Sequence, residues 1–350
     1  MTLSLYIARL FLARFAIILG ILASLLQIVD LLDDAGAALQ RGGTTALLTY
    51  AALRFPSIVD QLVPISVLIA ASLTLLALVQ SNEMVAMRTV GVTIYRIVAN
   101  LAAVALVIAA IHFALGDQVA PRTERKFKDW WSAAGGEMAQ GTRLWLREGT
   151  TVIGIDQVRG GGHVLEGVRL LFRDDEGRLQ RLVIAERAEA RNGWHLLGAR
   201  RFDAGPELGR SEIIASLPWD TRFVPADFAA LLAPTERLSV AHLHGILKGT
   251  AAGLRGRTFY EARLHRKFAL PATSLVMVLL AAPAAHGSQR GGTAIYGLAI
   301  GIAAGLVYLF VDTFMLAAGQ AGLLPPGLAV WTPVALFASI GAAALLRLEG

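Results

Sequence analysis

Two basic stretches of the chain carry the side chains best suited to bind an anionic group. One is PRTERKFKDWW at 121–131, and the other is RGRTFYEARLHRK at 255–267. Guanidinium and ammonium groups pair with phosphates and carboxylates, so the chemistry on offer is anion binding. The same composition is typical of helices anchored in the lipid headgroup region, where Trp130 and Trp131 would also lie. From the residues alone, charged anchoring is the favoured interpretation and anion binding the alternative.

The segment SNEMVAMRTVGVTIYR at 81–96 offers a different chemistry, that of a protein-binding surface. It is too polar to cross a membrane. Helical spacing predicts that Met84, Met87 and Arg88 share one face, and Gly91 can end or bend the helix. A methionine-rich face with a charged edge suits an adaptable contact with a partner. A plain interfacial anchor is the alternative, and the spacing favours neither.

Two acids and three glycines fall inside long apolar segments. Asp30 and Asp312 lie toward the ends of their segments, where an ionisable group is costly unless it is paired or hydrated. They predict either a polar lock between helices or acids hydrated at the membrane interface. Gly297, Gly301 and Gly305 recur every four residues. This spacing predicts a close, breakable helix contact or simple packing within a bundle.

Other functional classes have little support in the sequence. The chain has no cysteine, so it has no thiol nucleophile, thiolate metal site or disulfide framework. His163 and His195 lack the neighbouring Asp, Glu or Ser residues of a metal site or a catalytic triad. No G-x-x-x-x-G-K-[ST] phosphate loop occurs. The net charge of +6 comes without a stacking platform or a recognition-helix pattern. We therefore expect no enzyme activity, no metal, no cofactor and no nucleic acid partner for this chain.

Most of the elements that position these residues are expected to be membrane spans. The chain is 55% hydrophobic and only 17% charged, which is too apolar for an ordinary soluble domain. Six apolar stretches approach or exceed the ~20 residues that cross a hydrocarbon core. They lie at 10–32, 57–80, 94–115, 268–285, 294–318 and 327–346. The first lacks a signal-peptide cleavage site and is too long for a signal-peptide core, so we expect it to remain as a span.

The basic residues of the short loops predict the orientation of these spans, because such residues concentrate on the cytoplasmic side. With the N-terminus inside, only Arg41 and Arg54 lie in short outer loops. The arginines on or near the inner side are then Arg9, Arg14, Arg88, Arg96, Arg290 and Arg347. We therefore predict that both termini are cytoplasmic. The long segment from about 117 to 265 is predicted to lie outside, in the periplasm of a cell with two membranes.

The outer segment has the pattern of a β domain. From about 143 to 224 it contains short runs with strand character, separated by turn residues such as Asn192-Gly193, a strong hairpin signal. This predicts one antiparallel sandwich or jelly roll. The predicted fold class is thus a membrane α-helical protein of six transmembrane helices with an inserted periplasmic all-β, jelly-roll-like domain. The expected boundaries are 1–116 for helices 1–3 with an inner-loop helix at 81–93, 117–142 for a helical connector, 143–232 for the β domain, 233–267 for a connector helix, and 268–350 for helices 4–6.

Taken in order, these features resemble one protein family over nearly the whole chain. Three helices, an outer β domain and three more helices are combined with NEMVAMRTVGV in the first inner loop, GDQVAP at 116–121 and HRKFALP at 265–271. This arrangement resembles the LptF/LptG permeases of the lipopolysaccharide export system. GDQVAP and the TRLWLREGTTVIGIDQV stretch that opens the β domain are more similar to the LptG branch.

The resemblance implies a permease subunit of an ABC transporter in the bacterial inner membrane. Such a subunit extracts lipopolysaccharide from the outer leaflet and passes it to a periplasmic bridge. The implied partners are an LptF-like permease subunit, an LptB-like ATPase dimer that uses ATP and Mg, and an LptC-like membrane-anchored bridge protein. Two alternatives remain. One is another membrane transporter, such as a secondary transporter with an ionic site at the midplane, and the other is a membrane-anchored assembly or sensor protein.

The resemblance also implies roles for the candidate residues. The inner-loop helix would seat in a groove of the ATPase through Glu83, Met84, Met87 and Arg88, with Gly91 allowing close approach. Lipid A phosphates need cations around an apolar cavity. The candidates for these phosphate contacts are Arg122, Arg125, Lys126 and Lys128, with Arg263, Arg266 and Lys267 across the cavity mouth.

Spans one and five form the lateral gate in this family, which implies a gate role for Asp30, Asp312, Gly301 and Gly305. One departure from the family lies near the outer end of span one. Asp33 and Asp34 occupy positions where family members carry two lysines. A basic contact from span one to the lipid phosphates is therefore in doubt in this chain.

Overall fold

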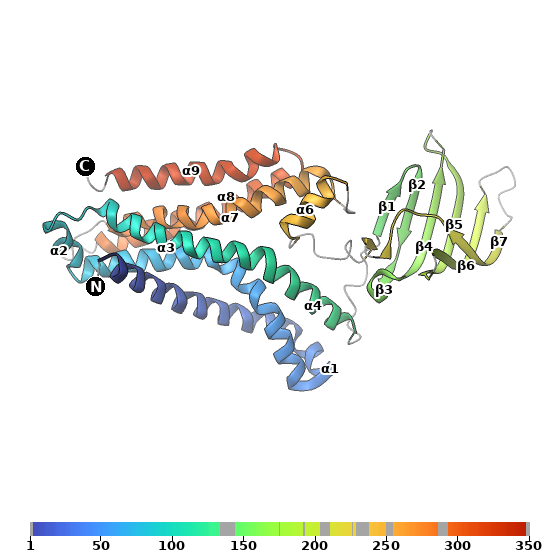
Figure 1. Cartoon of the computed structure of the whole chain (residues 1–350), viewed down its shortest axis with the longest axis horizontal. Helices are drawn as coiled ribbons and strands as arrows, with labels where there is room; N and C mark the ends of the chain where they lie inside the picture. Colours follow the sequence, from blue (N-terminus) through green and yellow to red (C-terminus); the bar gives the residue numbers. More distant parts are fainter. Residues whose placement is uncertain are drawn as a thin grey trace. The chain divides into compact units, whose positions relative to one another are not determined.

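The computed structural model divides the chain into two compact units, which are described separately. A helical unit comprises Met1–Lys128, Glu236–Leu247 and Arg255–Gly350, and a β unit comprises Asp129–Thr235 and Lys248–Leu254. Figure 1 shows the helices of the first unit and the sheet of the second. The residues that the structure describes are 3–133, 144–174, 176–191, 193–203, 211–225, 227–228, 238–249, 255–285 and 293–347.

Six helices of the helical unit are long and apolar enough to span a membrane, which confirms the six predicted spans. The first two form one element, α1 (Leu3–Gln80), in which Gly42 and Gly43 leave helical geometry and separate the two spans. The third span begins as α3 (Ile94–Ala114), continues through the π-turn η1 (Leu115–Val119) and ends in α4 (Ala120–Ala133). The last three are α7 (Arg257–Ala281) with the turn η4 (Ala282–Ala285), α8 (Thr293–Gln320) and α9 (Pro326–Arg347).

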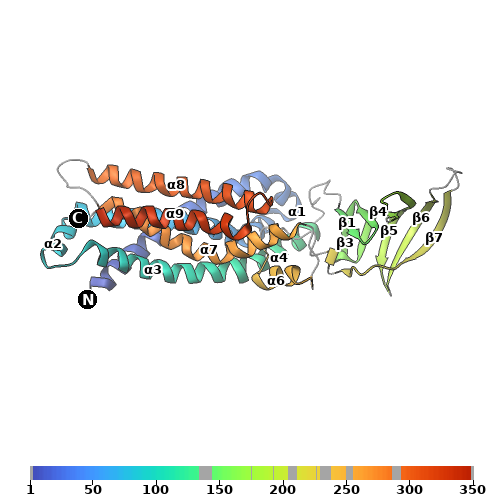
Figure 2. The same cartoon turned by 90° about the horizontal axis from the view of Figure 1, so that it is seen from above.

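Two short helices also belong to the described part of the helical unit. One is α2 (Glu83–Thr89), between the second and third spans, and the other is α6 (Val240–Leu247), which precedes α7. The central helix is α7, which contacts α1, α3, α6, α8 and α9. Figure 2 shows α3, α7, α8 and α9 running alongside one another. A single apolar core formed by buried residues of these helices therefore holds the unit together.

The β unit contains one antiparallel sheet with the order β1-β2-β4-β5-β6-β7, and β3 also pairs with β4. The strands are β1 (Leu144–Glu148), β2 (Thr151–Ile155), β3 (Gln157–Arg159), β4 (Val164–Arg173), β5 (Leu179–Ala190), β6 (Trp194–Asp203) and β7 (Ser211–Trp219). Alternate residues of the strands form a second apolar core, closed by Phe223 and Phe228 after the last strand. The period-2 pattern read from the sequence therefore marks the buried face of this sheet.

The predicted fold class of six membrane helices with an inserted antiparallel β domain is confirmed. Among the described strands there is one curved sheet rather than two facing layers (Figure 1). Short turns join most strands, and consecutive strands pair with each other, except that β2 and β3 both pair with β4. The predicted hairpin at Asn192-Gly193 is one of these turns: β5 and β6 pair across it, and Gly193 has φ of +100°. Asn192 itself lies outside the described residues, as do the predicted boundaries at 142/143 and 232/233.

Candidate functional site

The inner-loop helix α2 has the C-terminal signal that the sequence predicted. The helix ends at Thr89, and Gly91 follows in the left-handed region with φ of +83°. The Gly91 amide donates to the Arg88 carbonyl at 3.0 Å, and the Val92 amide donates to the Met87 carbonyl at 2.9 Å. Closing hydrogen bonds of this kind favour glycine because only glycine adopts positive φ without strain. Gly91 therefore ends α2, as predicted, while its contact with an ATPase stays a prediction.

The methionines of α2 face the core of the chain. Met84 and Met87 are only 4% and 8% exposed and belong to the same buried cluster as Ile7 and Phe11 of α1. Residues three apart share a helix face, but Arg88 lies about 100° further round and is exposed. Met84 and Met87 therefore anchor α2 to the bundle, and their contact with the ATPase stays a prediction.

The exposed face of α2 is formed by other residues. Val85 and Arg88 of α2 are exposed, the former at 60%, and Val90, which directly follows the helix, is 78% exposed. Glu83 is half-buried and lies near the Tyr6 hydroxyl. The surface available to a partner thus combines two valines with one guanidinium. The sequence prediction missed both valines because helical periodicity alone does not tell which face looks outward.

The basic residues of α4 lie on an amphipathic helix. Arg122, Arg125 and Lys126 are exposed, while Lys128 is half-buried. The opposite face packs inward through Phe127, whose ring meets the Tyr50 ring edge-on with centroids 5.2 Å apart. This arrangement presents three cations side by side on one face of the helix. Such a row can bind phosphate oxygens by charge-assisted hydrogen bonds, and that role stays a prediction.

The basic residues of α7 are engaged differently. Arg266 forms an ion pair with Asp312 of α8, and the two side chains are only 19% and 1% exposed. Lys267 donates to the Gly116 carbonyl at 2.6 Å and is 13% exposed. Arg263 places its guanidinium 5.5 Å from the centre of the Phe259 ring. A buried carboxylate requires a counter-ion, so Arg266 is held inside the bundle. Arg266 and Lys267 are thus both engaged within the chain, and their contacts with lipid phosphates stay a prediction.

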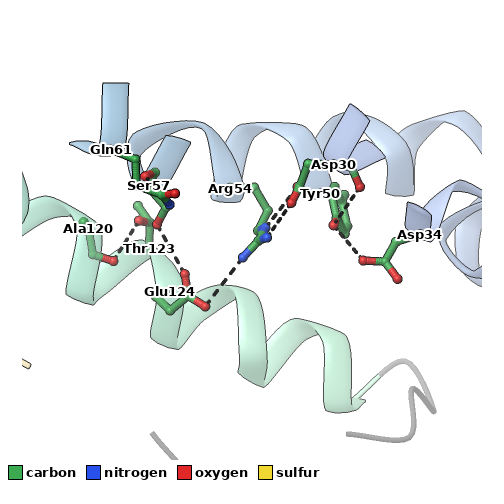
Figure 3. A network of polar contacts seen from close by, with 9 residues as sticks. All are labelled: Asp30, Asp34, Tyr50, Arg54, Ser57, Gln61, Ala120, Thr123 and Glu124. Atoms are coloured by element: carbon green, nitrogen blue, oxygen red, sulfur yellow. Dashed lines mark hydrogen bonds and ion pairs between the residues drawn. The ribbon is translucent and has the colours of Figure 1, made fainter. Parts of the chain in front are cut away.

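Asp30 belongs to a polar network that joins the first span to the second and to α4 (Figure 3). Arg54 donates to both oxygens of the Asp30 carboxylate, at 3.1 and 2.5 Å. A second carboxylate, that of Glu124, lies 3.9 Å from Arg54 and accepts a hydrogen bond from Ser57 at 3.2 Å. Asp30 and Asp312 are therefore both paired acids rather than simply hydrated ones. Their part in a gate stays a prediction.

The two acids that depart from the family pattern lie beside this network. Tyr50 donates from its hydroxyl to the Asp34 carboxylate at 2.8 Å, as Figure 3 shows, and Asp33 is exposed. Arg54 is thus paired with Asp30, and the neighbouring acids Asp33 and Asp34 make this end of the first span acidic.

The glycine stripe of α8 packs inside this chain. A Cβ at Gly301 would lie 2.8 Å from the Leu280 carbonyl oxygen, and one at Gly305 would overlap the Leu68 side chain. Gly297 is equally tight against the Pro283 carbonyl. The stripe therefore makes close helix contacts within the bundle, as both interpretations expect. The gate role of Gly301 and Gly305 stays a prediction.

Comparison with known proteins places these features in a family. The family model "Lipopolysaccharide export system permease LptF/LptG" matches residues 5–347, which include both units. The lipopolysaccharide export system permease protein LptG of Escherichia coli strain K12 is 25% identical over 335 residues, covering 93% of this chain and 92% of the relative. The LptG protein of Haemophilus influenzae is 22% identical over 276 residues, covering 76% of each chain. The chain therefore belongs to the LptF/LptG family of lipopolysaccharide export system permeases.

Proposed function

We propose that this chain is an LptG-like subunit of an ABC transporter that extracts lipopolysaccharide from the outer leaflet of the inner membrane. The observation that carries the proposal is the family match over residues 5–347, which extends across the spans, α2 and the β domain together. The proposed partners are an LptF-like permease subunit, an LptB-like ATPase dimer that binds ATP and Mg, and an LptC-like bridge protein. The proposed orientation has both termini in the cytoplasm and the β domain in the periplasm.

Coupling to the ATPase is proposed to occur through the exposed face of α2. Val85, Arg88 and Val90 supply apolar contact and one charge, which suits a shallow groove on a partner. Because Met84 and Met87 are packed into the same core as Ile7 and Phe11, a displacement of α2 acts directly on the beginning of the first span. The buried methionines would thus transmit the motion that the exposed residues receive.

Recognition of the lipid is proposed to involve the exposed cations of α4. Arg122, Arg125 and Lys126 would contact lipid A phosphates, since three neighbouring cations can share the charge of one phosphate group. The acyl chains would be held by apolar side chains of the spans. ATP-driven closure of the partner dimer would then expel the lipid toward the β domain, which passes it to the bridge.

Copurification tests the assembly directly. The tagged chain, expressed with its native neighbours and solubilised in mild detergent, is expected to bring down an LptB-like ATPase and an LptF-like permease. Recovery of the chain in a folded, monodisperse form without either protein would overturn the proposal.

A charge reversal on α2 tests the coupling surface. Arg88→Glu is expected to reduce ATP-dependent release of lipopolysaccharide from proteoliposomes at least tenfold, because interface charges that meet a like charge cost several kcal/mol. Arg178→Glu serves as the matched control, since Arg178 is an exposed arginine of the β unit. Met87→Leu is expected to retain release because it conserves buried volume. Normal release by Arg88→Glu would reject the assigned surface.

A further inference from the structure

A polar cluster of the helical unit lies at the π-turn η1, where the sequence LGDQV interrupts the otherwise α-helical third span. A π-turn inserts one extra residue, shifts the backbone hydrogen bonds by one position, and often marks a functional position. Here the interruption falls at Gly116 and Asp117, and both residues make contacts with other helices.

The side chain of Lys267 on α7 binds the backbone of Gly116. Its Nζ donates to the Gly116 carbonyl oxygen at 2.6 Å and lies 3.9 Å from the Asp117 carboxylate. An ammonium group this far from solvent requires acceptors, and the π-turn supplies both a carbonyl and a carboxylate. The contact therefore joins the third span to α7 at a defined point.

Asp117 binds the beginning of α6. Its carboxylate accepts a hydrogen bond of 2.7 Å from the amide of Val240, the first residue of that helix. First-turn amides have no partner within a helix, and an acid at this end also interacts favourably with the helix dipole. Ser239 provides a local cap as well, because its hydroxyl oxygen accepts a hydrogen bond from the His242 amide. Asp117 thus satisfies an amide that the local cap leaves open. Figure 2 shows α6 alongside the boundary between α3 and α4.

The position of the π-turn is fixed from its other side by the second span. A Cβ at Gly116 would lie 2.6 Å from Oδ1 of Asp60, so any larger residue there would displace the Asp60 carboxylate. Asp60 in turn is held by His112, whose Nε2 lies 2.9 Å from the Asp60 carbonyl oxygen and 3.2 Å from its carboxylate. The side chain of His112 is only 1% exposed, so this contact belongs to the core. Gly116 is therefore confined between the second span and α7.

We propose that Asp117 and Lys267 form a latch that fastens α6 to the π-turn, and that this latch is required for delivery of the lipid but not for ATP hydrolysis. The proposal rests on the proposed function. In the chain, α4 leads out of the helical unit toward the β domain and α6 leads back from it. A latch between η1 and α6 obliges the two connectors to move together with α7. Releasing it would leave the spans and α2 intact while the connectors move independently.

Two variants break the latch from opposite sides. Asp117→Ala removes the acceptor, and Val240→Pro removes the donor amide while keeping the helix, because proline is well tolerated at the first helical position. Val240→Ala is the matched control, since it shortens the side chain and retains the amide. The first readout is hydrogen exchange of the amides of 241–247 in the purified subunit in detergent. Both latch variants are expected to exchange roughly tenfold faster, and Val240→Ala to match the native chain.

The second readout is transport by the assembled complex in proteoliposomes. Both latch variants are expected to lower delivery of lipopolysaccharide about tenfold and to leave the ATPase rate within about twofold of the native complex. Unchanged exchange in both variants would refute the latch, and faster exchange with normal delivery would refute its role in transport. Equal loss of delivery and ATP hydrolysis would also refute that role. Failure of the native complex to deliver lipid would reject the proposed function, while the exchange measurement still tests the latch.

Discussion

The first and fourth spans are attached to the helical unit in opposite ways. Only 6% of the apolar window of the first span is buried, against 61% for the fourth. Ile17, Ile21 and Leu25 of the first span are exposed, whereas α7 in the fourth span contacts most of the other helices. Lipid tails solvate isoleucine as well as protein does, so exposed apolar residues cost little in a membrane. The first span is therefore held at its two ends, and the fourth is held along its length.

Two ion pairs of the spans, Arg266–Asp312 and Arg54–Asp30, follow the same division. In the pair that joins α7 to α8, the side chain of Asp312 is 1% exposed. In the pair between the first two spans, the side chains of Arg54 and Asp30 are 28% and 18% exposed. The closed pair lies within a packed core beside Tyr308, which shares a hydrogen bond of 2.8 Å with Thr273. The open pair lies near the carboxylates of Asp34 and Glu124, and Asp30 belongs to the largely exposed first span. We infer that the closed pair supports the fold, and that the open pair positions one span.

Breaking the closed pair is expected to have the largest effect. Asp312→Ala leaves the Arg266 guanidinium buried without its counter-ion, which costs about 3–5 kcal/mol in free energy of unfolding. Denaturant unfolding of the purified subunit in micelles measures this loss. The control is the double variant Arg266→Met with Asp312→Leu, which fills the same space without charge and is expected to recover most of the stability. A single variant as stable as the native chain would contradict the burial of this pair.

The sequence predicted the features of both regions that depend on neighbouring residues. Hydropathy marks the six spans, alternation marks the strands, and a charge inside an apolar run singled out Asp30 and Asp312 as unusual. The partners of these acids could not be predicted. Arg54 follows Asp30 by 24 positions, and Arg266 lies on a different helix from Asp312. Such pairings depend on which helices pack together, and single-sequence patterns do not encode that.

Two features of the candidate site were not predictable, for the same reason. Periodicity correctly grouped Met84 with Met87, and the glycines of α8 with one another, but it did not show what each group faces. The methionines and the glycines both turn toward the core of this chain. The role of Asp117 was missed for a further reason. No short-range pattern announces a π-turn, and its contact with Val240 joins residues 123 positions apart.

Breaking the open pair is expected to have a smaller effect on stability and a local effect on structure. Arg54→Met removes both hydrogen bonds of the Arg54 guanidinium to the Asp30 carboxylate, and we expect a loss of about 1–2 kcal/mol, between the values for exposed and buried pairs. The chain has no cysteine, so spin labels on cysteines introduced at Leu32 and Leu48 report the two spans alone. Their distance distribution should broaden in Arg54→Met. Tyr50→Phe, which removes the hydrogen bond to Asp34, should broaden it less. An unchanged distribution in both variants would show that packing alone holds the first span.

The smallest expected effect concerns pH and the attachment of α6. Burial lowers the pKa of His242 from its usual value of 6.5, and the positive charge of Arg125 on α4 lowers that pKa further. Below pH 6.5, His242 is protonated more readily when α6 is detached or unfolded than when α6 is packed. Docking of α6 therefore keeps its full stability above about pH 6.5 and loses part of it as the pH falls toward the lowered pKa.

Hydrogen exchange of 241–247, corrected for the intrinsic pH dependence of exchange, measures this loss. Exchange should accelerate by less than tenfold between pH 7 and pH 5, a smaller change than the loss of Asp117 produces. His242→Phe should abolish the acceleration because it keeps an aromatic ring at this position without a titratable group. His244→Phe, on the same helix, should retain it. Acceleration that persists in His242→Phe would assign the pH dependence to another group, and the attachment of α6 would then depend on Asp117 rather than on the histidine.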